Sequence, residues 1–223
     1  MSVQTSGKIL RYQLSQRLIH WFGVAGFMLL LVTGLILEFS PLAFLAAGGV
    51  VRTLHRIGAV IYILWPIAYG IINPRQFVEV IKESLTYGRD ELEWFKHVPL
   101  YFSGRACMMP PQGRVNAGQK IHHLGVGISS ITIVGSGLIL WLGKGNLGMN
   151  GLAATAIVHD ISMLVLTVLF VGHAYFTFLY GALPAMISGY VTEEYARLEH
   201  SKWLASLQKK EDKSTLSSPI QNK

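Results

Sequence analysis

The stretch that decides the fold is IVHDISMLVLTVLFVGHAYF, residues 157–176. It is long enough to span a membrane, since about 20 apolar residues cross a bilayer as a helix, and Asp160 is its only charged residue. His159 and His173 lie fourteen residues apart within it. At about 100° and about 1.5 Å per residue, both imidazoles lie on nearly the same helix face, about 21 Å apart along the axis. One helix therefore offers an imidazole near each side of a membrane.

The composition is that of an integral membrane protein. Of the 223 residues, 51% are hydrophobic and only 14% are charged, whereas a soluble domain has about 25% charged residues. The single cysteine, Cys107, excludes an iron–sulfur cluster, a CxxCH haem attachment and an internal disulfide. A redox centre in this chain would therefore use histidine or another ligand. The net charge of +7 does not indicate nucleic acid binding, because the basic residues flank apolar segments.

Four apolar segments predict four transmembrane helices, at residues 18–38, 55–72, 121–142 and 152–180. We expect an all-α integral membrane four-helix bundle over residues 1–203, followed by a polar, mobile tail at 204–223. Between the second and third helices, residues 76–97 are predicted to form one or two amphipathic cytoplasmic helices, broken near Gly88.

Basic residues are unevenly distributed among the segments outside these helices. Sixteen lie in the N-terminal segment, in residues 73–120 and in the segment after residue 180, against two, Arg52 and Lys144, in the other connections. The positive-inside rule assigns the basic side to the cytoplasm. The sequence therefore predicts a multi-pass protein of the bacterial inner membrane with both termini cytoplasmic.

This topology sorts four histidines into two pairs. His20 begins the first helix on the cytoplasmic side, and His55 begins the second on the outer side. Because the fourth helix runs inward, His159 shares the outer leaflet with His55, and His173 shares the inner leaflet with His20. Two neutral imidazoles at one depth on different helices suit a six-coordinate b haem that transfers electrons. We predict two haem b groups, with these four histidines as ligands of the haem iron.

Two other interpretations of the paired histidines remain open. A single histidine near the end of a span is commonly an interfacial residue, although a polar imidazole at membrane depth is costly and functional by default. A zinc or di-metal site is weaker, because only Asp160, beside His159, offers a carboxylate at matching depth.

The remaining histidines lie outside the pairs. His122 and His123 open the third helix, where we expect interfacial placement, with a role near a quinone or in proton relay as the alternative. His97 and His200 are expected to be solvated.

Four stretches resemble the cytochrome b (gamma) subunits of respiratory formate dehydrogenases. They are RYQLSQRLIHW at 11–21, RVNAGQK at 114–120, the stretch at 157–176, and GALPAMISGYVTEEYARLEHSKW at 181–203. The resemblance covers nearly the whole chain, and NAGQK and the last stretch are its more specific parts. The histidines alone would also match the cytochrome b subunits of hydrogenases and thiosulfate reductases, which form the wider dihaem family.

The resemblance implies a division of labour. A molybdenum or tungsten subunit oxidises formate, an Fe–S subunit relays electrons to the outer haem, and the cytochrome b subunit passes them through the inner haem to menaquinone or ubiquinone at the cytoplasmic side. The positions that match the family's haem ligands are His20, His55, His159 and His173, and those that match its quinone site are Asn116, Gly118 and Gln119.

The quinone positions have sensible chemistry of their own. Asn116 and Gln119 offer amide donors for a quinone carbonyl, and Gly118 lets a headgroup approach the backbone. The alternative is that Asn116 caps the third helix and Gly118 serves loop geometry. Arg52 and Arg56 flank His55 and could pair with haem propionates or, alternatively, with lipid headgroups.

Departures from the family pattern and two other functions stay open. CMMPPQGR at 107–114 has no confident match, and His122–His123 stands where apolar or aromatic residues are expected, so the quinone type is undetermined. The chain could serve a Ni–Fe hydrogenase or a thiosulfate- or polysulfide-type molybdoenzyme. It could also be a haem-free anchor or transporter, although a transporter would favour inverted repeats and broken helices, which are not seen.

Overall fold

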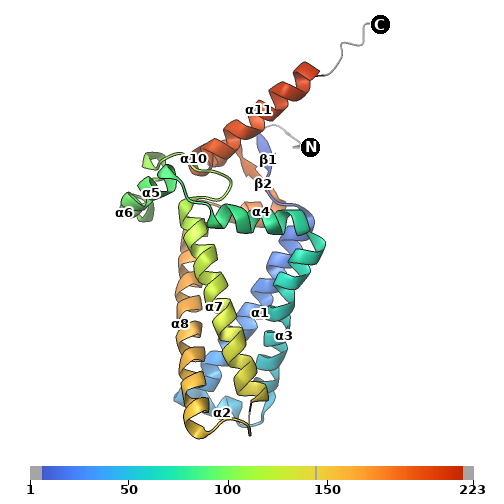
Figure 1. Cartoon of the computed structure of the whole chain (residues 1–223), viewed down its shortest axis with the longest axis vertical. Coiled ribbons are helices and arrows are strands. Elements are labelled where there is room, and N and C mark those ends of the chain that lie inside the picture. The colour runs from blue at the N-terminus through green and yellow to red at the C-terminus, as the bar shows by residue number, and fades with distance from the viewer. Residues whose placement is uncertain (1–6, 144, 218–223) are drawn as a thin grey trace. The chain divides into compact units, whose positions relative to one another are not determined.

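The computed structural model describes residues 7–143 and 145–217, and their contacts divide the chain into two compact units (Figure 1). The helical unit consists of Leu14–Glu79 and His122–Ala174. The terminal unit consists of Met1–Gln13, Val80–Ile121 and Tyr175–Lys223.

The helical unit is formed by four long apolar helices, which run alongside one another in Figure 1. They are α1 (Leu14–Glu38), α3 (Val50–Ile72), α7 (Ala117–Leu142) and α8 (Met149–Leu179), and the last two continue into the terminal unit. Each contains an 18-residue window with a mean hydropathy between 1.4 and 2.0. The short η1 (Ser40–Leu42) and α2 (Ala43–Ala46) connect α1 to α3. The predicted all-α membrane bundle is confirmed.

All four predicted helices are present, and each begins a few residues earlier than hydropathy indicates. For α1 and α7 the added residues are LSQR and AGQK, in which Gln and a basic residue lower the hydropathy while most members still favour helix. Hydropathy detects only the part of a helix that matches hydrocarbon, so it cannot detect polar turns that continue the same helix.

Small residues let α1 and α3 pack closely. A Cβ on Gly26 would lie 2.7 Å from Cγ2 of Ile61, and one on Gly23 would lie 3.1 Å from the Trp65 ring. In lipid, helices gain no hydrophobic driving force for association, so close van der Waals packing stabilises the pair instead. These glycines therefore hold the first and second spans together.

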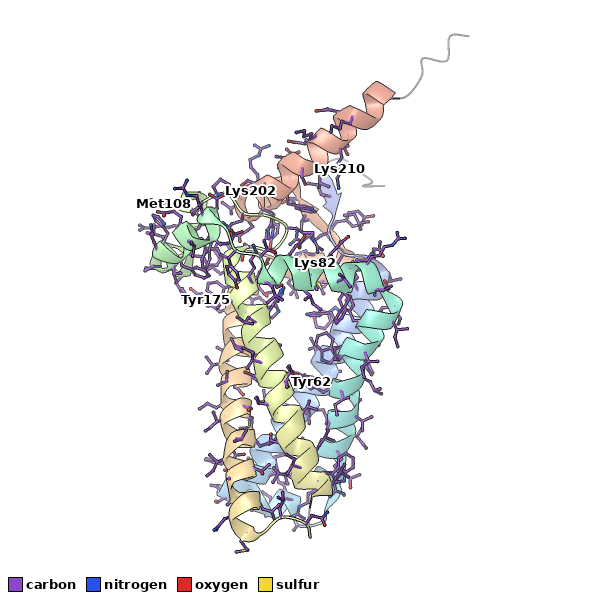
Figure 2. All side chains as sticks on the ribbon, viewed as in Figure 1. Tyr62, Lys82, Met108, Tyr175, Lys202 and Lys210 are labelled. Carbon is purple, nitrogen blue, oxygen red and sulfur yellow. The ribbon has the colours of Figure 1, made fainter. Side chains whose placement is uncertain are left out.

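Hydroxyl contacts join α7 to its neighbours. The hydroxyls of Tyr62 on α3 and Ser130 on α7 lie 2.7 Å apart, and Figure 2 shows Tyr62 about midway along the long helices. Those of Thr132 on α7 and Ser162 on α8 lie 2.8 Å apart. Hydrogen bonds of this kind stabilise membrane helix pairs by about 0.6 kcal/mol on average.

The terminal unit contains a two-stranded antiparallel sheet that the sequence analysis missed. Strand β1 (Lys8–Leu10) pairs with β2 (Tyr190–Thr192), with Ile9 opposite Val191. Both of these side chains are buried in one cluster with Ala185, Ala196 and Leu204. The sheet therefore ties the N-terminal segment to the segment that follows α8.

Short helices complete the terminal unit. The predicted amphipathic helices are α4 (Pro74–Leu85), which begins in the helical unit, and α5 (Arg89–Lys96), and they are separated at Gly88 as expected. The others are α6 (Val98–Phe102), η2 (Ala106–Met108), α9 (Leu183–Ser188), α10 (Glu193–Glu199) and α11 (Ser201–Ser217).

The predicted polar tail overlaps helix α11. Its first residue, Leu204, is buried, and the helix continues to Ser217. The mobility of residues 204–223 stays a prediction, and residues 218–223 lie outside the described part of the chain.

Candidate functional site

The structure brings the rings of His55 on α3 and His159 on α8 close to each other. Their ring centroids are 6.4 Å apart, with an angle of 64° between the ring planes. An axial imidazole nitrogen lies about 2 Å from its metal, which puts the centroids of two imidazoles on one iron about 6 Å apart. The spacing of this pair, called here the outer pair, therefore fits ligation of one haem iron between the rings.

The second pair has the same spacing. His20 on α1 and His173 on α8 have ring centroids 6.4 Å apart and planes at 48°. Because His159 and His173 share α8, one helix contributes to both pairs, as the fourteen-residue interval indicates. This second pair is called here the inner pair.

Glycines confine the rings of the outer pair. A Cβ on Gly34 of α1 would lie 3.5 Å from Cε1 of His55, and one on Gly137 of α7 would lie 3.1 Å from Cε1 of His159. A side chain at Gly137 would press on the His159 ring, and one at Gly34 would touch the His55 ring. The absence of side chains here leaves each ring room to stand between two helices.

Both outer-pair rings also contact a buried hydroxyl. Nδ1 of His55 lies 2.8 Å from Oγ1 of Thr33, and Nδ1 of His159 lies 3.1 Å from Oγ of Ser136. Hydrogen bonds to the nitrogen that does not bind metal orient a ligating imidazole. Sequence reasoning missed both hydroxyls, because a Ser or Thr in an apolar helix ordinarily bonds its own backbone.

The inner pair has a different environment. Nδ1 of His20 is buried and has no hydrogen-bond partner among the described residues. The ring of His122 on α7 stacks on that of His173, with centroids 5.2 Å apart and planes at 18°. His122 is half-buried, and His123 is exposed as expected for an interfacial residue. The structure therefore adds a third imidazole to the inner pair.

Within the described residues, the paired histidines are not part of a larger cluster of metal-binding side chains. Among residues 7–143 and 145–217, no group of three or more His, Cys, Asp or Glu side chains could hold a metal ion. Pairs of imidazoles alone suit a haem, whose porphyrin supplies the other four nitrogen ligands.

The arginines beside His55 have separate surroundings. The guanidinium of Arg56 lies 5.3 Å from the ring centre of Trp141, a cation–π contact between α3 and α7. Both residues line a shallow apolar groove of about 390 Å³. Arg52 is exposed.

Asn116 and Gln119, the predicted quinone contacts, form a capping box at the start of α7. Oδ1 of Asn116 accepts from the backbone N–H of Gln119 at 2.8 Å, and Oε1 of Gln119 accepts from that of Asn116 at 3.0 Å. A Cβ on Gly118 would lie 2.9 Å from the Trp94 ring. All three residues thus have structural roles, and their contact with a quinone stays a prediction.

A buried polar cluster surrounds Asn116. Its Nδ2 donates to Oε2 of Glu199 at 3.0 Å, and the Tyr101 hydroxyl donates to the same oxygen at 2.8 Å. Oε1 of Glu199 is buried without a partner in the described chain. Burial raises the pKa of Glu199, although its two hydrogen bonds oppose the shift.

His200 is fully buried, so the expectation that it is solvated was wrong. Its Nδ1 lies 2.8 Å from the carbonyl of Gly113, and Nη2 of Arg11 lies 3.3 Å from its Nε2. Burial, and the charge of Arg11 after it, holds the pKa of His200 well below its ordinary value. The sequence around His200 is polar and gives no sign of burial, because the residues that contact His200 come from distant parts of the chain.

Comparisons with known proteins point to membrane cytochromes. A family model described as prokaryotic cytochrome b561 matches residues 11–189. The formate dehydrogenase cytochrome b556 subunit of Haemophilus influenzae is 21% identical over 91% of this chain and 85% of its own length. In Escherichia coli K12, the nitrate-inducible cytochrome b556(Fdn) subunit is 22% identical over 93% of this chain and 95% of its own. The formate dehydrogenase cytochrome b556(fdo) subunit of the same strain is 24% identical over 92% of this chain and 96% of its own length.

Proposed function

Because the chain belongs to the prokaryotic cytochrome b561 family, we propose that it is the membrane cytochrome b subunit of a respiratory formate dehydrogenase. It is an integral membrane protein with four apolar helices. The formate assignment rests on relatives that align over more than nine-tenths of this chain and are named as formate dehydrogenase cytochrome subunits.

The chain binds two b haems. His55 and His159 hold the outer haem and His20 and His173 the inner one, and the observation that carries this proposal is the 6.4 Å centroid separation in both pairs. A bound b haem supplies one-electron transfer. With two imidazoles per iron, no coordination position stays open for substrate. Arg52 and Arg56, next to His55 in sequence, neutralise haem propionates at the outer side.

The complex is completed by partner subunits. A molybdenum or tungsten subunit oxidises formate, and an Fe–S subunit delivers electrons to the outer haem on the periplasmic side. The basic segments keep both termini in the cytoplasm, and the complex lies in the bacterial inner membrane.

Electrons leave the inner haem for a quinone at the cytoplasmic side. Gln119 is the donor best placed to bind a quinone carbonyl. Its Oε1 accepts the capping-box bond from Asn116, and within the described chain its Nε2–H₂ group forms no hydrogen bond. Gly118 leaves room for the Trp94 ring against the start of α7, and Asn116 holds the turn through Glu199.

The test is a reduced-minus-oxidised spectrum with haem quantification on the wild type, His159→Ala and His173→Ala. We expect two b haems per chain in the wild type and the loss of a different one in each variant. His97→Ala is the matched control, because His97 lies outside the four long helices and its Nδ1 is 2.9 Å from the backbone carbonyl of Glu93. No haem in the wild type would overturn the proposal.

Purification of the complex through a tag on this chain tests the partners. We expect a molybdenum- or tungsten-containing subunit, an Fe–S subunit and formate-dependent reduction of the haems. Recovery of a nickel–iron subunit and reduction by hydrogen would instead assign the chain to a hydrogenase.

A further inference from the structure

The hydroxyls of Thr33 and Ser136 are buried beside the outer pair. Thr33 is 3% exposed and Ser136 is 5% exposed. They stand on α1 and α7, neither of which supplies a histidine to this pair. All four long helices therefore meet at the outer site, two through imidazoles and two through hydroxyls.

Each hydroxyl oxygen lies closer to a carbonyl of its own helix than to the imidazole. Oγ1 of Thr33 donates to the carbonyl of Leu29 at 2.6 Å, and Oγ of Ser136 donates to that of Thr132 at 2.7 Å. A hydroxyl has one proton and two lone pairs. With that proton given to the nearer carbonyl, each oxygen acts as an acceptor towards the imidazole.

It follows that Nδ1 carries the proton in both outer-pair rings. Nδ1–H of His55 donates to Thr33, and Nδ1–H of His159 donates to Ser136. A neutral imidazole has one N–H, so Nε2 of each ring presents a lone pair. The two hydroxyls thus select the tautomer that can bind a metal through Nε2.

The inner pair lacks this arrangement. Nδ1 of His20 is buried without a partner in the described chain. His173 contacts the rings of His20 and His122, and no hydroxyl hydrogen-bonds to its ring within residues 7–143 and 145–217. The two pairs therefore match in spacing and differ in what holds their second nitrogen.

We propose that Thr33 and Ser136 are positioning residues that lower the reduction potential of the outer haem below that of the inner haem. The inference rests on the proposed function. A hydrogen bond donated from the second nitrogen increases the basicity of a ligating imidazole. Stronger donation favours the ferric iron, which lowers the potential. An electron supplied by the Fe–S subunit then moves downhill, leaving the outer haem ferric and the inner haem ferrous.

The experiment is a redox titration of both haems in the intact complex, followed by optical spectra and by the EPR signals of the ferric forms. Thr33→Val and Ser136→Ala remove the hydroxyls with little change of shape. We expect each to raise the outer potential and to leave the inner one unchanged. A tenfold change in the ferric-to-ferrous ratio corresponds to about 59 mV for one electron, and we expect a shift of this order for the double variant.

Three controls separate this effect from a structural one. Thr33→Ser and Ser136→Thr keep the acceptor and are expected to retain the wild-type potential. Thr167→Val is matched, because the Thr167 hydroxyl likewise donates to a carbonyl of its own helix, that of Met163, 2.8 Å away. It should leave both potentials unchanged.

The outcomes are distinguishable from failure of the proposed function. Two bound haems with unchanged potentials in both hydroxyl-deletion variants would overturn this inference and leave the dihaem assignment standing. No haem in the wild type would overturn the assignment itself. If Thr33→Val fails to retain the outer haem, Ser136→Ala decides by the same titration, because its hydroxyl acts on the other ligand.

Discussion

The imidazole of His122 lies stacked on that of His173, with ring centroids 5.2 Å apart and planes only 18° from parallel. His122 stands at the start of the third membrane helix and His173 near the end of the fourth. Because His173 is a proposed ligand of the inner haem, the stack limits how that ligand can turn.

Removal of the stack should loosen the inner haem. An aromatic pair contributes about 0.5–1.5 kcal/mol beyond its buried area, so we expect His122→Ala to weaken inner-haem retention about two- to tenfold. His122→Phe keeps an aromatic ring and should retain the haem. Haem quantification after detergent washing measures this, with His123→Ala as the control. Equal retention in His122→Ala and the wild type would show that the stack does not hold the ligand.

Pairing of the histidines could be predicted because it depends on helix order and depth alone. Once four spans alternate in direction, His159 must share a leaflet with His55, and His173 with His20. The ends of α1, α3 and α7 at residues 38, 72 and 142 were likewise predictable, since apolar sequence stops there. Histidine pairing and helix ends depend only on the order of apolar and polar residues along the sequence.

The surroundings of each pair could not be predicted in this way. Thr33 and Ser136 look like ordinary polar residues of membrane helices until the rotation of each helix about its axis is known. His200 is buried by partners more than eighty residues away in sequence. The β1–β2 pairing joins two three-residue strands that are too short to show an alternating pattern.

The ion pair between Lys120 and Glu91 should stabilise the terminal unit. Their charged groups are 2.7 Å apart and both side chains are buried, and Nζ of Lys120 also donates to the carbonyl of Thr86. Removing one partner leaves a buried charge and typically costs about 3–5 kcal/mol. We expect Glu91→Leu to unfold at a lower temperature than the wild type, as followed by circular dichroism in detergent.

Two variants control that measurement. Lys96→Met removes an exposed pair with Glu93 and should leave the melting temperature unchanged. The double variant Glu91→Leu with Lys120→Met removes both charges and should recover most of the loss. A double variant as unstable as Glu91→Leu alone would contradict the idea that the unpaired charge causes the loss.

Gly26 should tolerate no side chain. A Cβ there would meet Ile61 at 2.7 Å, and overpacking of this kind costs about 1–3 kcal/mol. We expect Gly26→Ala to lower the thermal stability of the bundle. Gly127→Ala is the matched control in a membrane helix, because nothing lies within 4 Å of its Cβ position. It should be neutral or stabilising, since alanine favours helix over glycine. Equal melting temperatures for the two variants would contradict the close α1–α3 contact.

Glu199 should make the stability of the terminal unit depend on pH. Its ordinary pKa of 4.5 applies to the unfolded chain, and burial raises the pKa in the folded protein. Below pH 4.5 both states are protonated, and the carboxyl causes no penalty. Between 4.5 and the raised value the folded state binds more protons, so the free energy of unfolding falls as the pH rises. The loss is about 1.4 kcal/mol for each unit by which the pKa is raised.

Glu199→Gln isolates this dependence because glutamine does not titrate. Its carbonyl oxygen can still accept from Tyr101 and Asn116, which donate to Oε2 of Glu199 in the wild type. Burial, with the nearby Glu199 charge, raises the pKa of Tyr101, so its hydroxyl remains a donor across the measured range. We expect denaturation midpoints of the variant to fall less than those of the wild type between pH 4.5 and 8. Glu194→Gln changes an exposed carboxylate of the same helix and should keep the wild-type slope. Parallel pH profiles for Glu199→Gln and the wild type would mean that Glu199 is not the group whose burial sets the slope.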